Sequence, residues 1–187
     1  EGFSFKQLGQ VLSNPVVWLA ALTLFFVYFF YTGVNQTTGY MKDVMMIAPG
    51  TVLIVGTVRT YGVSLISGPV FGTIAAKLGS PSRVIGFGSV VVMIGLAVFA
   101  FLPAQASLAY VAVAMAILLA FIANGVFGIC SSQLTEGKVP VRVFGTATGL
   151  LSVVGFMPDT FSYIWFGSIR DAHQDNPTVA YNQIFLI

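Results

Sequence analysis

Charge is scarce in this chain, which carries eight Lys or Arg and six Asp or Glu in 187 residues against a hydrophobic share of 57%. Soluble domains have roughly a quarter of their residues charged, so this composition excludes a water-soluble fold and indicates a membrane protein. The single cysteine, Cys130, excludes an internal disulfide. The single histidine, His173, lies in a loop beside acidic residues and is expected to be solvated.

Sites that need several polar side chains are also missing. One Cys and one His leave no zinc site and no nucleophilic constellation, and there is no phosphate-binding loop or basic cluster. We therefore expect no enzyme activity, no metal, no cofactor and no nucleic-acid partner.

Long charge-free runs make up most of the chain, and turn residues divide them into lengths that can cross a bilayer, which takes ~20 mainly apolar residues. The expected spans are 15–35, 49–78, 82–102, 107–133 and 141–169, with an incomplete sixth over 179–187. Residues 1–14 are predicted to be a cytoplasmic amphipathic approach segment, and residues 15–187 a transmembrane bundle. The fold class is therefore an all-α membrane protein embedded in the lipid bilayer. Since the chain does not begin with Met, we expect it to be a piece of a larger membrane protein.

The loops differ in positive charge, which predicts the orientation. Alternate loops on one side carry Lys6, Lys77, Arg83, Lys138 and Arg142, whereas the other side carries Lys42 and Arg170. The more basic side is expected to face the cytoplasm. We call this side the inner end and the opposite side the outer end.

Two charged residues, Arg59 and Asp159, fall deep inside spans, whereas the other charges lie at span ends or in loops. Such residues cost at least ~2.5–3.5 kcal/mol on insertion scales and mark ion pairs, polar cavities or transport paths. At 1.5 Å rise per residue, Arg59 lies roughly 12 Å and Asp159 roughly 15 Å inside the outer end of their spans. Three readings stay open: a structural Arg59–Asp159 pair, an anion-binding Arg59 with Asp159 as competitor or proton switch, and no contact between the two.

The span that contains Asp159 has a stripe of small and polar residues. Its members are separated by 3, 4, 3, 4 and 3 positions: Gly145, Thr148, Ser152, Gly155, Asp159 and Ser162. This is helical periodicity, and in lipid a polar face must point to protein or to an aqueous cavity. We expect Thr148, Ser152 and Ser162 to line a cavity with Asp159.

Other spans offer further candidates for substrate contacts. Tyr28, Tyr31 and Asn35 are spaced 3 and 4 apart, and are interpreted either as an interfacial aromatic belt or as cavity-lining groups. Asn124 is either a hydrogen bond between helices or a ligand contact. Pro69 and Pro158 predict kinks, and small residues four apart, as in Gly68–Gly72 and Gly145–Gly149, permit close helix approach.

The loop after the second expected span carries a motif. Gly72-Thr73-Ile74-Ala75-Ala76-Lys77-Leu78-Gly79, followed by Arg83, resembles the G-x-x-x-D-[RK]-x-G loop of the major facilitator superfamily, with Ala76 in the place of Asp. Gly145-Thr146-Ala147-Thr148-Gly149 and Gly155-Phe156-Met157-Pro158-Asp159 are similar to a helix of its bacterial organic-anion and sugar-acid members. The resemblance implies the carboxy-terminal six-helix half-bundle (helices 7–12), the last helix truncated, with Gly72, Lys77, Gly79 and Arg83 as loop-motif residues. It also implies an amino-terminal half as the partner.

These features together predict a secondary active transporter of a small hydrophilic solute, an organic anion or sugar acid, coupled to a proton or sodium gradient. Arg59, Tyr28, Tyr31, Asn35 and Asn124 are the expected substrate contacts, and Asp159 with Arg59 the coupling pair. The alternatives are an exporter of hydrophobic or cationic compounds, and a non-transporting receptor or assembly protein. The expected location is the bacterial inner membrane.

Overall fold

The computed structural model of the protein describes residues 5–187, and these residues form helices joined by short loops. The helices are α1 (Phe5–Leu12), α2 (Pro15–Asn35), α3 (Thr37–Asp43), α4 (Pro49–Thr57), α5 (Ser64–Leu78), α6 (Pro81–Ala100), α7 (Ala109–Ile129), α8 (Gln133–Glu136), α9 (Phe144–Gly155), α10 (Pro158–Ala172) and α11 (Pro177–Leu186). A π-helical segment, Val58–Val63, joins α4 to α5. Residues 1–4 of the expected approach segment lie outside the described residues.

Five helical stretches are long and apolar enough to cross a membrane. They are Pro15–Asp43, Pro49–Leu78, Pro81–Ala100, Ala109–Glu136 and Val141–Ala172. The first and last run further toward the outer end than the sequence analysis expected, because α3 continues after α2 and α10 extends to Ala172. The protein is therefore an all-helical membrane protein.

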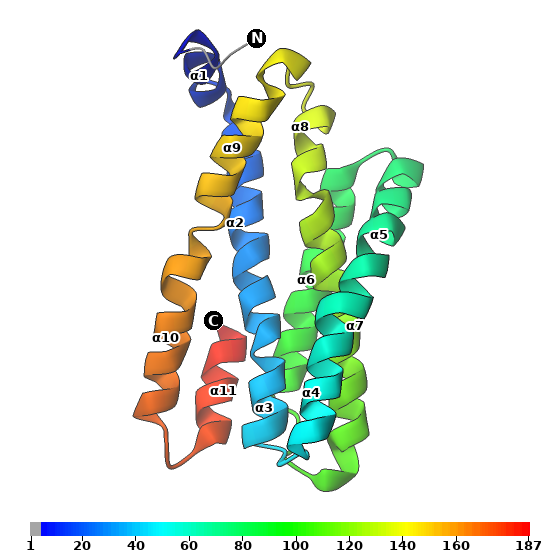
Figure 1. The fold of residues 1–187 in the computed structure, drawn as a ribbon, viewed down its shortest axis with the longest axis vertical. Coiled ribbons are helices and arrows are strands. Elements are labelled where there is room, and N and C mark those ends of the chain that lie inside the picture. Colours follow the sequence, from blue (N-terminus) through cyan, green and yellow to red (C-terminus); the bar gives the residue numbers. More distant parts are fainter. Residues whose placement is uncertain (1–4) are drawn as a thin grey trace.

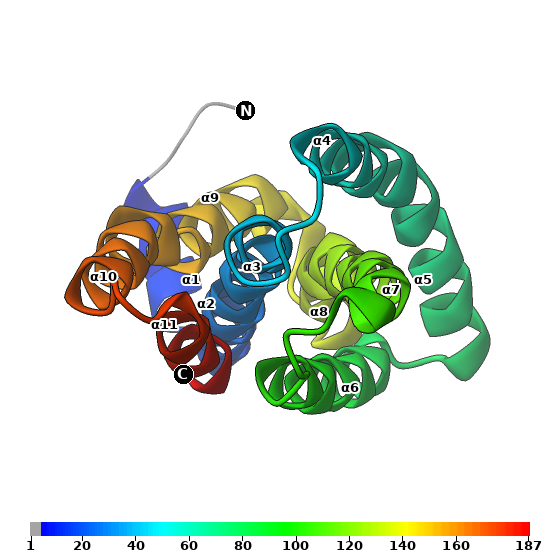
Figure 2. The ribbon, with the colours of Figure 1, turned by 90° about the horizontal axis from the view of Figure 1, so that it is seen from below.

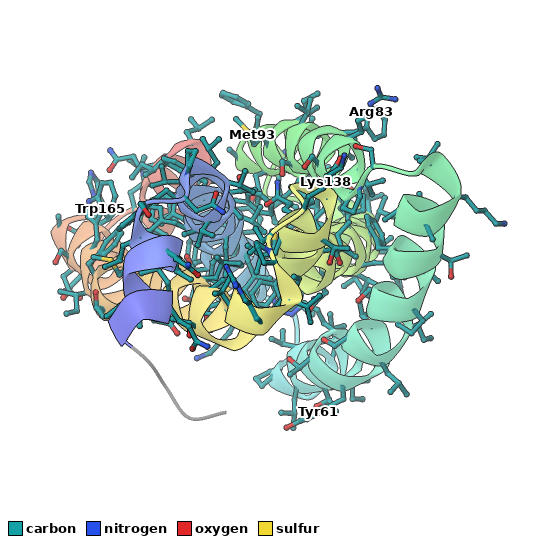
Figure 3. The ribbon with its side chains drawn as sticks, turned by 90° about the horizontal axis from the view of Figure 1, so that it is seen from above. Tyr61, Arg83, Met93, Lys138 and Trp165 are labelled. Carbon is teal, nitrogen blue, oxygen red and sulfur yellow. The ribbon has the colours of Figure 1, made fainter. Side chains whose placement is uncertain are left out.

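Consecutive stretches run in opposite directions (Figure 1). The α5–α6 and α8–α9 connections lie at the end of the bundle that also holds α1, and the α3–α4, α6–α7 and α10–α11 connections lie at the other end. The first end is the basic, inner end defined above. Figure 3 looks onto it and shows Arg83 and Lys138 there.

Four of the membrane stretches depart locally from α-helical hydrogen bonding; in Ala109–Glu136 this is a 3-10 turn at Cys130–Ser132. The first breaks at Gln36, between α2 and α3, and the second contains the π-helical segment. The last breaks at Phe156 and Met157, because Pro158 has no backbone N–H to continue the ladder. There Met157 N–H donates to the Val154 carbonyl over 3.2 Å and Asp159 N–H donates to the Phe156 carbonyl over 3.0 Å; each bond spans three residues, where an α-helix spans four.

Glycine lets the central helices pack closely. A Cβ at Gly125 of α7 would overlap the ring of Phe71 in α5, and a Cβ at Gly155 of α9 would overlap Leu24 of α2. As a result α7 lies against α5, and α2 lies against α9. Figure 2 shows α4 and α9 on the same side of α2 and α7, with α6 and α11 on the opposite side.

The glycines of the Gly68–Gly72 and Gly145–Gly149 pairs do not point into such a close helix contact. At Gly68, Gly72, Gly145 and Gly149 an added Cβ would meet no atom within 4 Å in the part of the chain that the structure describes. These surfaces of α5 and α9 are therefore open to another helix or to lipid.

Candidate functional site

Arg59 lies in the π-helical segment, partly buried, and its side chain reaches the backbone of α2. Its Nη1 donates to the Val34 carbonyl over 3.0 Å. This carbonyl is accessible to side-chain donors because the helix breaks two residues later, and it also accepts a 2.7 Å bond from the Thr37 hydroxyl. Within the described residues no other hydrogen bond of Arg59 is found, so most of the five N–H donors of the guanidinium stay free for a ligand.

The π-helical turn explains how Arg59 comes to point this way. Its wider turn adds a residue relative to an α-helix, so residues before and after it no longer share the α-helical register. Such π segments are frequent at functional sites.

Asp159 lies in the first turn of α10, directly after the break at Pro158. The Tyr28 hydroxyl of α2 donates to its Oδ2 over 2.8 Å. The carboxylate also sits at the positive end of the α10 dipole, which favours negative charge. These two features hold Asp159 in an orientation that faces α2.

No salt bridge joins Arg59 to Asp159 in the described residues, since each has its own partner. Of the three readings given above, this conformation has the two charges unpaired with each other: Asp159 is bonded to Tyr28 and Arg59 to the Val34 carbonyl.

Aromatic rings surround the two charges. Tyr28 and Tyr31 stack with centroids 5.7 Å apart, and each packs on Phe127 of α7, at 5.6 and 5.7 Å. Phe156, in the break before α10, meets Tyr28 edge to face at 4.9 Å. Stacked rings of this kind offer flat apolar surface next to a cation and a carboxylate.

Tyr163 is a further member that the sequence analysis missed. It lies four residues after Asp159 on α10, hence on the same helix face, and within coulombic range of Arg59, Tyr28 and Tyr31. The i to i+4 spacing from Asp159 was the available sequence signal. Phe127, Phe156 and the Val34 carbonyl had no comparable signal.

The two candidate asparagines lie differently. Asn124 of α7 donates from Nδ2 to the Ala120 carbonyl over 2.8 Å and accepts from the Ser64 hydroxyl of α5 over 3.0 Å. Both of its polar atoms thus have partners within the bundle, which fits the interpretation as a bond between helices. Asn35 is the last residue of α2 and is partly buried next to Val34.

The stripe predicted around Asp159 is split in the structure. Thr148 is exposed and accepts, through its carbonyl, a 3.0 Å bond from the hydroxyl of the partly buried Ser152. Ser162 is buried with Pro158 and Phe166 on the packed face of α10, and its Oγ has no hydrogen-bond partner among residues 5–187. The break at Phe156 and Met157 separates Thr148 and Ser152 on α9 from Asp159 on α10. Ser162 shares α10 with Asp159, but in this conformation it is buried whereas Asp159 is exposed, so the expectation that the two line one cavity does not fit.

The loop-motif residues lie at the inner end. Gly79 ends α5 with φ of +65°, a left-handed conformation that favours glycine, while Lys77 and Arg83 are exposed. The acid at this junction comes from elsewhere: Glu136 of α8 accepts bonds from the hydroxyls of Ser80 and Ser82 and a 2.9 Å bond from the Ser82 N–H. Glu136 thereby ties the start of α6 to the end of the α7–α8 stretch.

Metal ligands do not gather in the described residues, where no group of three or more His, Cys, Asp or Glu could hold an ion. Cys130 is buried, and its thiol donates a hydrogen bond to the Val126 carbonyl over 3.3 Å.

Known proteins similar to the chain are inner membrane proteins. It is 27% identical over 165 residues to the inner membrane protein YihN of Escherichia coli (strain K12), covering 88% of this chain and 39% of that protein. It is 25% identical over 173 residues to the inner membrane protein YqcE of the same strain, covering 91% of this chain and 41% of that protein. The chain thus spans about two fifths of the length of these relatives. No family model matches it, and no solved structure matches it significantly.

These comparisons correct the family assignment. The loop and helix motifs resemble the major facilitator superfamily, but the similar proteins are named only as inner membrane proteins and no family model supports the resemblance. Short glycine-rich motifs recur wherever membrane helices turn and pack closely, which is why they identify a family poorly. With the five membrane-crossing stretches, the comparisons do make the chain part of a multi-pass inner membrane protein.

Proposed function

We propose that the full-length protein is a secondary active transporter that moves a small hydrophilic organic anion, such as a carboxylate or sugar acid, by alternating access. The observation that carries this proposal is Arg59, a guanidinium in a membrane-crossing stretch with one carbonyl as its hydrogen-bond partner in the described residues. A cation at that depth without a paired acid is costly, and an anionic solute would offset the cost.

The neighbouring groups suit such a solute. A carboxylate can bind two guanidinium N–H groups at once, which fixes its orientation. The remainder of the solute would then lie against the stacked rings of Tyr28 and Tyr31, 5.7 Å apart, with their hydroxyls as hydrogen-bonding groups.

Coupling to an ion gradient would involve Asp159. A bound anion brings a second negative charge near this carboxylate, and a proton or sodium ion taken up at Asp159 would relieve the repulsion. Tyr28, which donates to Asp159 over 2.8 Å, would then have to change partner, linking occupancy of the site to movement of α10 relative to α2.

The second wall of the binding site would come from the rest of the full-length protein. The relatives are about two and a half times as long as the matched region, and α5 and α9 carry glycine faces that meet no other described residue. Helices from the remaining part would cover these faces and enclose the site.

The test uses full-length protein in proteoliposomes and labelled acetate, succinate and gluconate, with and without a proton or sodium gradient. We expect uptake or counterflow of at least one of these anions, lost by more than tenfold in Arg59→Ala and partly retained in Arg59→Lys. Arg170→Gln, which removes a cation from the last turn of α10 at the outer end, serves as the control and should transport normally. Equal transport by Arg59→Ala and wild type would refute the proposal.

The same assay separates the alternatives. An exporter of cationic or hydrophobic compounds should need Asp159 and not Arg59, so Asp159→Asn would abolish export while Arg59→Ala would not. A receptor or assembly protein would show no counterflow of any solute.

A further inference from the structure

A hollow of about 400 Å³ lies between α3 and α4, toward the outer end of the bundle. Its lining includes the amine-bearing Lys42 of α3 and the hydroxyl-bearing residues Thr38, Thr57, Thr60 and Tyr61. The Thr38 hydroxyl oxygen has no hydrogen-bond partner within the described residues and is covered by protein atoms, so it does not face the hollow. A solute in the hollow would instead meet Lys42 and the exposed residues Thr60 and Tyr61.

The hollow is positively charged. No Asp or Glu is among the described residues that line it. The nearest acid in the sequence, Asp43, is turned to α11, where its Oδ2 accepts a 2.7 Å bond from the Tyr181 hydroxyl. Lys42 is exposed and its charge is therefore left without an acidic partner inside the hollow.

The hollow continues the face of α2 that carries the candidate site. Tyr28, Tyr31, Asn35, Thr38 and Lys42 are separated by 3, 4, 3 and 4 positions. Because α3 follows α2 with a break only at Gln36, this spacing keeps them near one face over about 14 residues, roughly 21 Å. Arg59 donates a hydrogen bond to the Val34 carbonyl, which lies about midway between Tyr28 and Lys42 in the sequence.

We propose that the Lys42–Thr38 hollow is a second, outer anion-binding site, which captures a small carboxylate from the outer solution before it reaches Arg59. Lys42 supplies the charge and the N–H donors to the carboxylate, whereas the Thr57 hydroxyl already donates its hydrogen to the Leu53 carbonyl over 2.9 Å. The capture role rests on the proposed function, whereas anion binding in the hollow does not.

The test measures the local potential and anion occupancy directly. Full-length protein without other cysteines, including Cys130→Ser, carries Thr60→Cys as a reporter on the wall of the hollow. Its labelling rate is measured from the outer side with an anionic and a cationic methanethiosulfonate of similar size. Lys42→Gln should lower the anionic-to-cationic rate ratio roughly three- to tenfold, as expected for losing one nearby charge in water, and Lys42→Arg should restore it. Lys138→Gln, at the inner end (Figure 3), is the matched control and should leave the ratio unchanged.

Sodium gluconate is then added as the carboxylate probe, with sucrose and sodium chloride as controls. We expect gluconate to slow labelling of Thr60→Cys in protein with Lys42 and not in Lys42→Gln. An unchanged rate ratio in Lys42→Gln, or no protection by gluconate when Lys42 is present, would overturn the site. Because labelling needs no transport, a positive result together with absent anion uptake would refute the proposed function and leave the binding site standing.

Discussion

The contact between α5 and α7 depends on a single glycine, and replacing it should measurably destabilise the protein. A Cβ at Gly125 would overlap three ring atoms of Phe71. Phe71 is 8% exposed and packs edge to face on Phe121 at 5.8 Å, so its ring cannot turn aside without disturbing a second aromatic residue. Gly125→Ala must therefore push α5 away from α7.

The size of the effect follows from comparison with Gly128, three residues along the same helix. A Cβ at Gly128 would meet the Cα of Gly68 at 3.7 Å, which is ordinary van der Waals contact. Both substitutions change the intrinsic helix preference equally, so this contribution cancels in the difference between them. What remains is overpacking, which typically costs about 1–3 kcal/mol.

The assay is reversible unfolding of the full-length protein in detergent with Gly125→Ala and Gly128→Ala compared side by side. We expect Gly125→Ala to be less stable by about 1–3 kcal/mol, roughly a 5- to 150-fold change in the unfolding equilibrium. The 3.0 Å bond from the Ser64 hydroxyl to Asn124 crosses the same contact and should be weakened as well. Equal stability of the two variants would show that the Phe71 contact is not tight and would refute the reasoning.

Two other contacts can be tested by substitution. Tyr28→Phe and Asp159→Asn should each lower the free energy of unfolding by roughly 1 kcal/mol, and the double variant should lower it little further, because all three variants lose the same 2.8 Å bond. A double-mutant cycle on unfolding measures this, and strictly additive effects would argue against the bond. Glu136→Ala should speed amide hydrogen exchange at Ser82 and Arg83 about 5- to 30-fold, because it removes a hydrogen-bond acceptor at the start of α6 worth about 1–2 kcal/mol. The control is Thr135→Ala at the neighbouring exposed residue; equal exchange in the two variants would show that Glu136 does not stabilise the start of α6.

Much of the membrane architecture follows from composition and pattern. Lipid requires long apolar helices and confines charges to the loops, so the positions of charged and turn residues predict where each membrane stretch begins and ends. The exceptions to this rule, Arg59 and Asp159, are for the same reason the residues that the sequence marks as functional. Pro158 likewise predicts an interruption, because a proline cannot donate the backbone hydrogen bond that a helix needs at that point.

Which groups meet is decided only in three dimensions. Arg59 and Asp159 have opposite charge and similar depth, yet Tyr28 contacts Asp159 and a backbone carbonyl contacts Arg59. These partners depend on how each helix is rotated about its axis. The π-helical segment and the break at Phe156 and Met157 change that rotation, and a sequence pattern that assumes a continuous α-helix cannot predict the change. Helix packing also decides that Ser162 is buried and that Lys42 lines a hollow. The type of a residue determines which bonds its side chain can make, and the packing of neighbouring helices determines what that side chain faces.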